Sequence, residues 1–502
     1  MVQKGNLTLP SISNNESLSN CNMKFIKNYI DGQLIPPVLD EHLENIDPSR
    51  GKVYSMIPDS NSEDVEKAVE AAEQAYEGWS NTPAVERAAI MIKIADIIES
   101  RLDEFAQAES LDNGKPLKLA TMVDIPRAVS NLKFFATAIQ HFAAESYYME
   151  GMGFNYTLRR PIGIVGCISP WNLPLYLFTW KIAPAIAAGN CVIAKPSEVT
   201  PMTAFMLSEV CAEAGLPKGV LNIIHGLGPK VGDTMTKHPK IKAISFTGGT
   251  ATGATIAKIA APMFKKLSLE LGGKNPNIIF ADCDMETALR TTLNSSFANQ
   301  GQICLCGSRI FIERPIYEEF KKRFVEATDK RKVSYPSDPE AKLGAIVSKS
   351  HMEKVLSYIE LAKEEGGTVL SGGTEVKLDG EYADGYYIRP TIIEGLAFDC
   401  RTNQEEIFGP VVTITPFDTE EEVLMMANST QYGLAATVWT ENLKKAHRVA
   451  ENLQSGIIWI NSWLVRDLRT PFGGMKNSGV GREGGFEALR FFTEPKNIFV
   501  KS

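Results

Sequence analysis

The chain has 502 residues, 44% hydrophobic and 22% charged, which is the composition of a globular protein with two or three domains. Its net charge of −8 argues against a nucleic-acid-binding surface. The eight cysteines show no C-x-x-C spacing and no histidine lies beside the closest pair, so we expect no metal site. A long chain with few cysteines favours a reducing compartment, the cytoplasm.

The N-terminus carries no secretory signal. Residues 1–22 are rich in Ser and Asn and poor in apolar side chains, so we predict a flexible extension. The longest apolar run, 161–178, contains three prolines, two glycines and an asparagine. These residues favour a buried strand and turn over a membrane helix, and we expect no membrane partner.

The first quarter of the remaining chain is predicted to be mostly helical. A short strand and turn are expected within 24–33. Apolar residues then recur at helical spacing, and the predicted helices are 62–79, 83–110 and 124–144.

Strands and helices then alternate. The predicted strands are 162–168, 191–195, 219–224 and 241–246, and the predicted helices between them are 177–188, 200–214 and 230–237. This order indicates a parallel sheet with helices on its faces, which is an architecture that binds nucleotides.

A second alternating series predicts another α/β domain. Its predicted strands are 277–280, 308–313, 368–370, 387–393, 411–417, 436–439 and 456–460. Its predicted helices are 285–298, 316–330, 348–365, 420–428 and 443–453. A last strand at 497–500 could pair with another element or another subunit.

Two glycine-containing turns are candidate phosphate sites. Thr247-Gly248-Gly249-Thr250 follows a predicted strand and opens a helix, where backbone amides can receive a phosphate. An ordinary strand-to-helix turn explains the sequence equally well, because the full G-x-G-x-x-G fingerprint is absent. Gly226-Leu227-Gly228 is a second candidate of the same weak kind.

Lys195 and Glu198 follow a predicted strand, at the end where parallel sheets bind ligands. They could hydrogen-bond ribose hydroxyls. A Glu198 carboxylate in that place would repel a 2′-phosphate and favour NAD over NADP. Alternatively, Ser197 caps a helix and Lys195 lies in solvent.

Asn172 and Glu270 are candidate catalytic side chains. Asn172 lies in a proline-bounded turn, where its carboxamide could donate a hydrogen bond to an oxyanion or could simply cap the next helix. Glu270 stands between two leucines, a setting that raises a carboxyl pKa and suits a general base. The alternative for Glu270 is an exposed position on a strand edge.

The loop 297–309 contains Cys304 and Cys306. A thiolate is a strong nucleophile where its surroundings lower its pKa or lend it a base. Taken alone, the loop favours two small buried cysteines, which is the commoner fate of free cysteines.

Seven segments in order, taken together, resemble one family, the NAD(P)-dependent aldehyde dehydrogenases, over about Phe25 to Val500. The segments are Pro170-Trp171-Asn172, Lys195-Pro196-Ser197-Glu198, Phe246-Thr247-Gly248, Glu270-Leu271-Gly272-Gly273-Lys274, Gly301-Gln302-Ile303-Cys304, Glu406-Ile407-Phe408-Gly409-Pro410 and Pro471-Phe472-Gly473-Gly474.

The resemblance implies a Rossmann-like NAD-binding domain over 23–144 and 162–272, and an α/β catalytic domain over 273–472. It further implies a small β region over 145–161 and 484–502 that joins subunits into a homodimer or homotetramer.

The resemblance also assigns roles. Cys304, rather than Cys306, matches the nucleophile, Glu270 the general base, and Asn172 the oxyanion donor together with the Cys304 N–H. The implied reaction oxidises an aldehyde to an acid through a thiohemiacetal and a thioester, with NAD as cofactor. Because the branch that transfers the acyl group to coenzyme A lacks this Glu, Glu270 favours hydrolysis.

The resemblance implies a cofactor-binding set. Its members are Trp171, Lys195, Glu198, Gly249, Thr250, Leu271, Glu406 and Phe408. In this set Lys195 and Glu198 match the adenine-ribose contacts, and Glu406 and Phe408 those of the nicotinamide end. The chain departs from the family where Gly249 replaces a frequent Ser and where Cys306 replaces a commoner Ala.

Arg127 and Arg466 are candidate substrate-binding residues, although most arginines lie in solvent. Two guanidinium groups can clamp a carboxylate and so select an acid-bearing semialdehyde.

The segments 169–177 and 463–468 resemble a narrower branch, the 2-aminomuconic and 2-hydroxymuconic semialdehyde dehydrogenases. The resemblance favours the aminomuconic substrate, which belongs to tryptophan (kynurenine) breakdown, and no residue decides against the hydroxymuconic one. The runner-up among enzymes is an aliphatic, betaine-type or retinal-type aldehyde dehydrogenase. A catalytically silent protein of this fold is the rival from another functional class.

Overall fold

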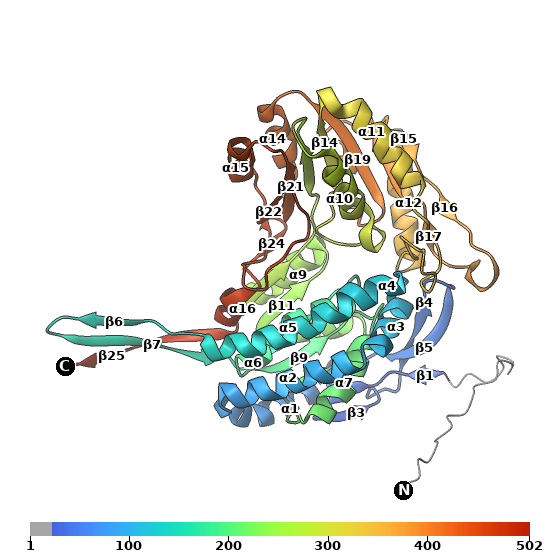
Figure 1. Cartoon of the computed structure of the whole chain (residues 1–502). Helices are drawn as coiled ribbons and strands as arrows, with labels where there is room; N and C mark the ends of the chain where they lie inside the picture. Colours follow the sequence, from blue (N-terminus) through green and yellow to red (C-terminus); the bar gives the residue numbers. More distant parts are fainter. Residues whose placement is uncertain (1–22) are drawn as a thin grey trace, which may run out of the picture.

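The computed structural model describes residues 23–502, so the extension predicted over 1–22 lies outside the described part. Two large sheets lie one above the other, and a thin three-stranded arm projects sideways from the lower one (Figure 1). Within 23–502, no helix combines the length and the apolar character that crossing a membrane requires.

The first sheet has eight strands in the order β24-β12-β11-β8-β9-β10-β2-β3. Their bounds are β2 Asn28–Ile30, β3 Gln33–Ile35, β8 Ile164–Ile168, β9 Cys191–Lys195, β10 Leu221–Ile223, β11 Ile241–Thr247, β12 Lys266–Glu270 and β24 Gly479–Val480. Strands β12, β11, β8, β9 and β10 are parallel. Every residue of β8 and β9 is buried, as expected for parallel strands covered on both faces.

The strand order reverses beside β8. The chain runs from β8 to β9 to β10 in one direction, and β11 then returns to the other side of β8. At such a reversal the loops that leave the two adjacent strands diverge and leave a crevice at their carboxyl ends. The loops after β8 and β11 therefore border the expected binding site.

The second sheet has seven strands in the order β15-β18-β19-β14-β13-β21-β22. The bounds are β13 Pro276–Ile279, β14 Arg309–Glu313, β15 Thr368–Ser371, β18 Thr391–Glu394, β19 Val411–Phe417, β21 Ala435–Trp439 and β22 Ile457–Ile460. All neighbouring pairs are parallel except β15 with β18. This is the second α/β unit that the sequence predicts.

Helices connect and cover these strands. They are α1 Ser62–Asn81, α2 Ala84–Ser100, α3 Leu102–Asn113, α4 Leu117–Leu119, α5 Ile125–Ala138, α6 Pro174–Ala187, α7 Met202–Ala214, α8 Asp233–Lys237 and α9 Thr250–Ala260 in the first half. In the second half they are α10 Met285–Phe297, α11 Arg314–Asp329, α12 Lys349–Glu364, α13 Arg401–Gln404, α14 Glu420–Asn428, α15 Leu443–Asn452 and α16 Gly485–Phe491.

The arm consists of β6 Ser146–Met149, β7 Gly153–Pro161 and β25 Thr493–Lys501 in one antiparallel sheet. It extends away from the body (Figure 1) and exposes Tyr147 and Tyr148 by 63% and 74%. The strand predicted at 497–500 is therefore longer than predicted and pairs within the chain. The predicted domain boundaries stay predictions.

Several sequence predictions were wrong in detail. The helix predicted over 83–110 is two helices, because Arg101 leaves helical geometry at φ −108° and ψ 26°. The helix predicted over 124–144 ends at Ala138. The strand predicted over 387–393 divides into β17 Tyr387–Ile388 and β18, because Pro390 between them has no N–H to donate.

Short strands were also missed. A three-stranded sheet combines β1 Lys24–Phe25, which falls within the strand and turn predicted at 24–33, with β4 His42–Asp47 and β5 Lys52–Pro58, which were not predicted. The remaining short pairs are β16 Glu375–Val376 with β17 and β20 Tyr432–Gly433 with β23 Met475–Lys476.

Candidate active site

Two adjoining cavities occupy the crevice at the strand-order reversal. The larger, about 610 Å³, lies over the loops that follow β8, β9 and β11. The smaller, about 250 Å³, lies between the loop after β8 and Cys304. Both are lined by Pro170, Trp171 and residues 247–249, so together they form one cleft that leads from the first sheet to the thiol.

Asn172 is placed in this cleft by the turn between β8 and α6. It is 2% exposed, and its Nδ2 donates to the Gln302 carbonyl at 2.9 Å. The alternative of a helix cap is wrong, because Leu173 occupies the cap position and makes no side-chain cap bond. One N–H of the Asn172 amide therefore remains for a ligand next to Cys304.

Cys304 lines the smaller cavity and is partly exposed to it. The loop is held in shape by Asn275, whose Nδ2 donates to the carbonyls of Cys304 and Cys306 at 2.7 and 2.9 Å. Burial among protein atoms, with the charges of Glu406 and Glu270, raises the pKa of the Cys304 thiol. Ionising Cys304 therefore requires a base or a nearby positive charge.

Cys306 is buried and does not line the cavities of the cleft. Burial raises the pKa of Cys306 to about 12. Cys306 shares with Cys304 only a neighbouring cavity of about 20 Å³, which is too small for an aldehyde, so Cys304 is the cysteine that lines the cleft.

Glu270 ends β12 and is 4% exposed, so the alternative of an exposed strand edge is wrong. Neither carboxylate oxygen has a hydrogen-bond partner among the described residues. Burial first, and the charge of Glu483 second, raise the pKa of Glu270 well above its usual range. These are the surroundings that suit a general base.

The Glu270 carboxylate is not among the groups that line the cleft. It lies against Gly473, where a Cβ would come within 2.8 Å of Oε1. The structure thus brings Cys304 and Asn172 to one cavity, whereas the charge of Glu270 acts on Cys304 but its side chain does not line that cavity.

The predicted ribose contacts border the larger cavity. Lys195 donates from Nζ to Glu198 Oε2 at 2.9 Å, and both residues line the cavity. Lys195 is only 2% exposed, so the alternative that places it in solvent is wrong. Ser197 does not cap a helix either, since α7 begins at Met202 with Pro201 at the cap position.

The N-terminus of α9 opens on the same cavity. Gly249 is the cap residue, and a Cβ built on it would meet no atom within 4 Å. The backbone amides that begin α9 are therefore accessible to an anion. Thr250 is the exception in the predicted set, because its Oγ1 accepts from the Gly272 N–H at 3.4 Å and the residue does not line the cavity.

The other predicted cofactor residues gather at the Cys304 end. Leu271, Glu406 and Phe408 all line the smaller cavity. Glu406 Oε1 accepts from the Gly273 N–H at 2.8 Å, and the Phe408 and Trp171 rings meet edge to face at 5.2 Å. Apart from Thr250, the predicted cofactor positions therefore line the cleft from end to end.

Arg127 and Arg466 come together although 339 positions separate them in the sequence. The guanidinium of Arg127 lies 5.4 Å from the Tyr176 ring, and Arg466 Nη1 donates to the Tyr176 hydroxyl at 3.1 Å. Both guanidinium groups also pack against Trp180, at 5.9 and 5.1 Å. Two positively charged side chains thus pack against the same two aromatic residues, Tyr176 and Trp180.

Neither arginine forms an ion pair with an acidic side chain within residues 23–502, and Arg127 lacks hydrogen-bond partners as well. Nε and Nη2 of Arg127 are buried without a hydrogen-bond partner in the described part of the chain. Burial, with the charge of Arg466 contributing, lowers the pKa of Arg127. The charge of Arg466 also acts to lower the pKa of both Cys304 and Glu270, although neither arginine lines the two cavities of the cleft.

Some residues of the site were not found by sequence reasoning. His351 lines the smaller cavity, and its Nε2 lies 2.7 Å from the Phe408 carbonyl, but nothing in the sequence of α12 signals this. Lys181 pairs with Glu483 at 2.8 Å, and both act on the pKa of Glu270. A lysine inside the apolar helix α6 was the one available signal.

Known proteins match the chain over almost its full length. The family model described as "Aldehyde dehydrogenase family" matches residues 37–498. A 2-aminomuconic semialdehyde dehydrogenase of Danio rerio is 52% identical over 95% of this chain and 99% of its own length. A 2-hydroxymuconic semialdehyde dehydrogenase of Pseudomonas sp. (strain CF600) is 48% identical over 95% and 100%.

Solved structures share the fold. An aldehyde dehydrogenase of Bacillus cereus, solved as an NAD+ complex, superposes with a TM-score of 0.92 at 39% identity, covering 95% of this chain and 97% of that one.

Proposed function

The chain belongs to the aldehyde dehydrogenase family, and we propose that it oxidises a carboxylate-bearing semialdehyde to the acid with NAD, most closely 2-aminomuconate 6-semialdehyde. The observation that carries the substrate class is the pair of guanidinium groups, Arg127 and Arg466, which meet at Tyr176 without lining either cavity of the cleft, while the charge of Arg466 acts on Cys304. The relatives' names support the muconic semialdehydes, and the aminomuconic substrate would assign the enzyme to tryptophan breakdown.

The residues divide the reaction between them. Cys304 Sγ adds to the aldehyde carbon, and the oxyanion accepts hydrogen bonds from Asn172 Nδ2 and from the Cys304 N–H, which has no acceptor among residues 23–502. NAD supplies, when bound, the acceptor for the hydride that leaves this carbon. Glu270 then takes a proton from the water that hydrolyses the Cys304 thioester.

The cleft fits a dinucleotide. Its larger cavity offers the accessible amides of α9 for a pyrophosphate and the Lys195–Glu198 pair for a ribose. Glu198 would meet the 2′-phosphate of NADP with a like charge. This arrangement supports NAD as the preferred cofactor.

Replacing Glu198 by alanine is expected to narrow the preference for NAD over NADP by ~10-fold or more, the scale of one like-charge contact. The ratio of kcat/KM for the two cofactors measures it. Glu209, an exposed glutamate of α7, provides the control, and Glu209→Ala should leave the ratio unchanged. An unchanged ratio in Glu198→Ala would exclude this role.

An aldehyde panel tests the function and the substrate class together. NADH absorbance should rise with NAD and a muconic semialdehyde, at much lower kcat/KM with neutral aldehydes. Arg127→Ala or Arg466→Ala should raise KM for the acid-bearing substrate by roughly 10- to 100-fold, the scale of a lost charged hydrogen bond, and change KM for a neutral aldehyde little.

Arg469 provides the matched control, because it lies on the same loop, is 79% exposed and pairs with Asp467. Arg469→Ala should match the wild type. Equal losses on charged and neutral aldehydes would exclude the clamp, and no NADH with any aldehyde would favour a catalytically silent protein.

The second candidate is 2-hydroxymuconic semialdehyde, since a relative of that name is nearly as similar. The two substrates share the terminal carboxylate that the arginines would bind. A direct comparison of kcat/KM separates them. A preference for aliphatic or betaine aldehydes would instead support the general members of the family.

We further propose a cytoplasmic homodimer or homotetramer that associates through the arm. The exposed aromatic side chains of the arm, Tyr147, Tyr148 and Phe154, support this, because an isolated monomer rarely leaves such a strip in water.

A further inference from the structure

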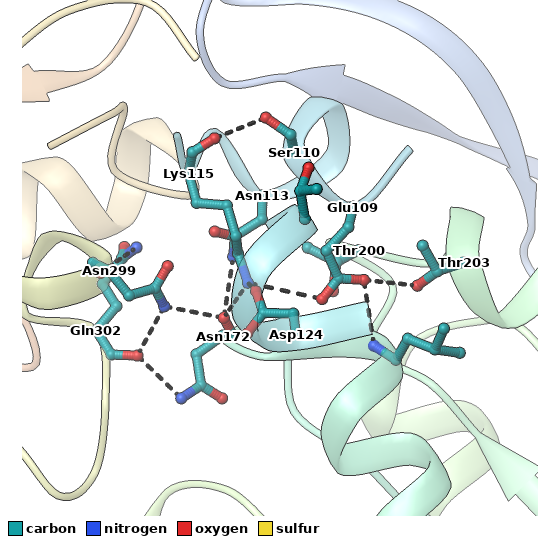
Figure 2. Close-up of polar contacts among 12 residues, drawn as sticks. Glu109, Ser110, Asn113, Lys115, Asp124, Asn172, Thr200, Thr203, Asn299 and Gln302 are labelled. Atoms are coloured by element: carbon teal, nitrogen blue, oxygen red, sulfur yellow. Dashed lines mark hydrogen bonds and ion pairs between the residues drawn. The ribbon is translucent and has the colours of Figure 1, made fainter. Parts of the chain in front are cut away.

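Three ionisable side chains lie buried directly behind Asn172 (Figure 2). Lys115 follows α3, Glu109 belongs to α3, and Asp124 ends the turn before α5. All three side chains are completely buried. Lys115 Nζ lies 3.6 Å from Glu109 Oε1 and forms a close ion pair with Asp124.

Lys115 also reaches the main chain of Asn172. Its Nζ donates to the Asn172 carbonyl at 3.2 Å, and Asn299 Nδ2 donates to the same oxygen at 3.0 Å. Figure 2 shows these bonds converging on one carbonyl while the Asn172 side chain points away to Gln302. Asn113 Nδ2 also donates to this oxygen, at 3.5 Å, so the backbone of the proposed oxyanion donor is fixed by an ammonium and two amides.

Glu109 holds the other side of the same turn. Its Oε2 accepts from the Leu175 N–H at 3.2 Å, in the first turn of α6, and from the Thr203 hydroxyl at 3.0 Å. The cluster therefore hydrogen-bonds the Asn172 turn at both ends: Lys115 bonds the Asn172 carbonyl, and Glu109 bonds the Leu175 N–H three residues later.

Such a cluster is a poor source of stability. Removing three ionisable groups from water carries a desolvation cost that their mutual attraction often fails to offset. Burial raises the pKa of Glu109 to about 7, although Lys115 acts to lower it. Stability alone therefore does not account for charged groups at this place, whereas fixing a backbone does.

We propose that Lys115 is a positioning residue for the aldehyde oxidation: it holds the Asn172 main chain so that the side-chain amide meets the oxyanion. The inference rests on the proposed function. The expected rate loss is bounded by the role of Asn172, because losing one oxyanion donor costs roughly 10²–10³ in rate in comparable sites. Loss of Lys115 should cost part of that, roughly 10- to 100-fold.

Two variants test the role. Lys115→Met removes the donor, and Lys115→Met with Asp124→Asn removes a positive and a negative group together, so that the buried charge stays balanced and the chain folds. In both, the rate of the first NADH turnover should fall 10- to 100-fold, while KM for NAD and the number of titratable thiols stay those of the wild type.

A double-mutant cycle separates positioning from general damage. If Lys115 acts through Asn172, its replacement should cost nothing further in an Asn172→Ala background. Asp112→Asn is the matched control, because Asp112 is a buried acid of α3 whose carboxylate bonds Asn45 and the Met202 N–H instead. It should lower Tm and leave the first-turnover rate unchanged.

The outcomes are distinct. First-turnover rates like those of the wild type in the Lys115 variants would overturn the inference. So would a rate loss from Lys115→Met that is as large in the Asn172→Ala background as in the wild type. In either case an active wild type would leave the proposed function standing. A wild type that oxidises no aldehyde would overturn both.

Discussion

Cys304→Ala is expected to abolish aldehyde-dependent NADH formation, with a loss of roughly 10⁴-fold or more, as for the removal of a nucleophile elsewhere. Cys304 is the cysteine that reaches the cavity beside Asn172, and no other side chain there can form the thioester. The measurement is NADH absorbance with saturating NAD and semialdehyde.

Cys306→Ala is the matched control two residues away. Because Cys306 is buried outside the cleft, its replacement should leave kcat within a few-fold of the wild type. Binding of NAD, followed by protein fluorescence, should persist in both variants. Residual NADH formation in Cys304→Ala, or its abolition in Cys306→Ala, would indicate that Cys306 rather than Cys304 is the nucleophile.

Glu270→Gln is expected to separate the two halves of the reaction. Cys304 and Asn172 stay in place, so one NADH per active site should form rapidly. Hydrolysis of the thioester should then slow by roughly 10²–10⁴-fold, the usual contribution of a general base. Stopped-flow absorbance distinguishes the burst from the steady state. A proportional loss of both phases would show that Glu270 acts before the thioester forms.

The raised pKa of Glu270 makes hydrolysis of the Cys304 thioester depend on pH. Only the carboxylate accepts a proton, so hydrolysis should increase with pH through a pKa well above that of an exposed glutamate. In Glu270→Gln the steady-state rate should lose this increase. The burst should keep its own rise with pH, since burial also raises the pKa of Cys304.

The turning of Glu270 toward Gly473 adds a requirement. The side chain must rotate to reach water beside Cys304. The position in which Glu270 lies depends on Gly473, because any Cβ there would come within 2.8 Å of Oε1.

The central fold was predictable because its strands are short, apolar and buried on both faces. The strand predicted at 191–195 has the bounds of β9, and β8 and β11 were found within two residues. In the sheet of β1, β4 and β5, the strands β4 and β5 were missed; His42–Asp47 is mostly polar and makes no apolar run.

The site was predictable in parts. Cys304, Asn172, Lys195 and Glu198 stand in segments typical of the family, and the structure places them along one cleft. Sequence reasoning paired Arg127 with Arg466 as a carboxylate clamp, but the contact that each makes with Tyr176 follows only from the fold. Burial of an ion cluster behind Asn172 likewise follows only from three-dimensional packing.

The return of the chain to its first sheet has a consequence for synthesis on the ribosome. The edge strand β24 and the Lys181 partner Glu483 lie some 300 residues after α6. A nascent chain that emerges N-terminus first can form the inner strands early. Until Glu483 is made, the Lys181 ammonium has the Ser245 hydroxyl as a partner but lacks its carboxylate, so the first sheet gains its edge strand and its buried ion pair late in synthesis.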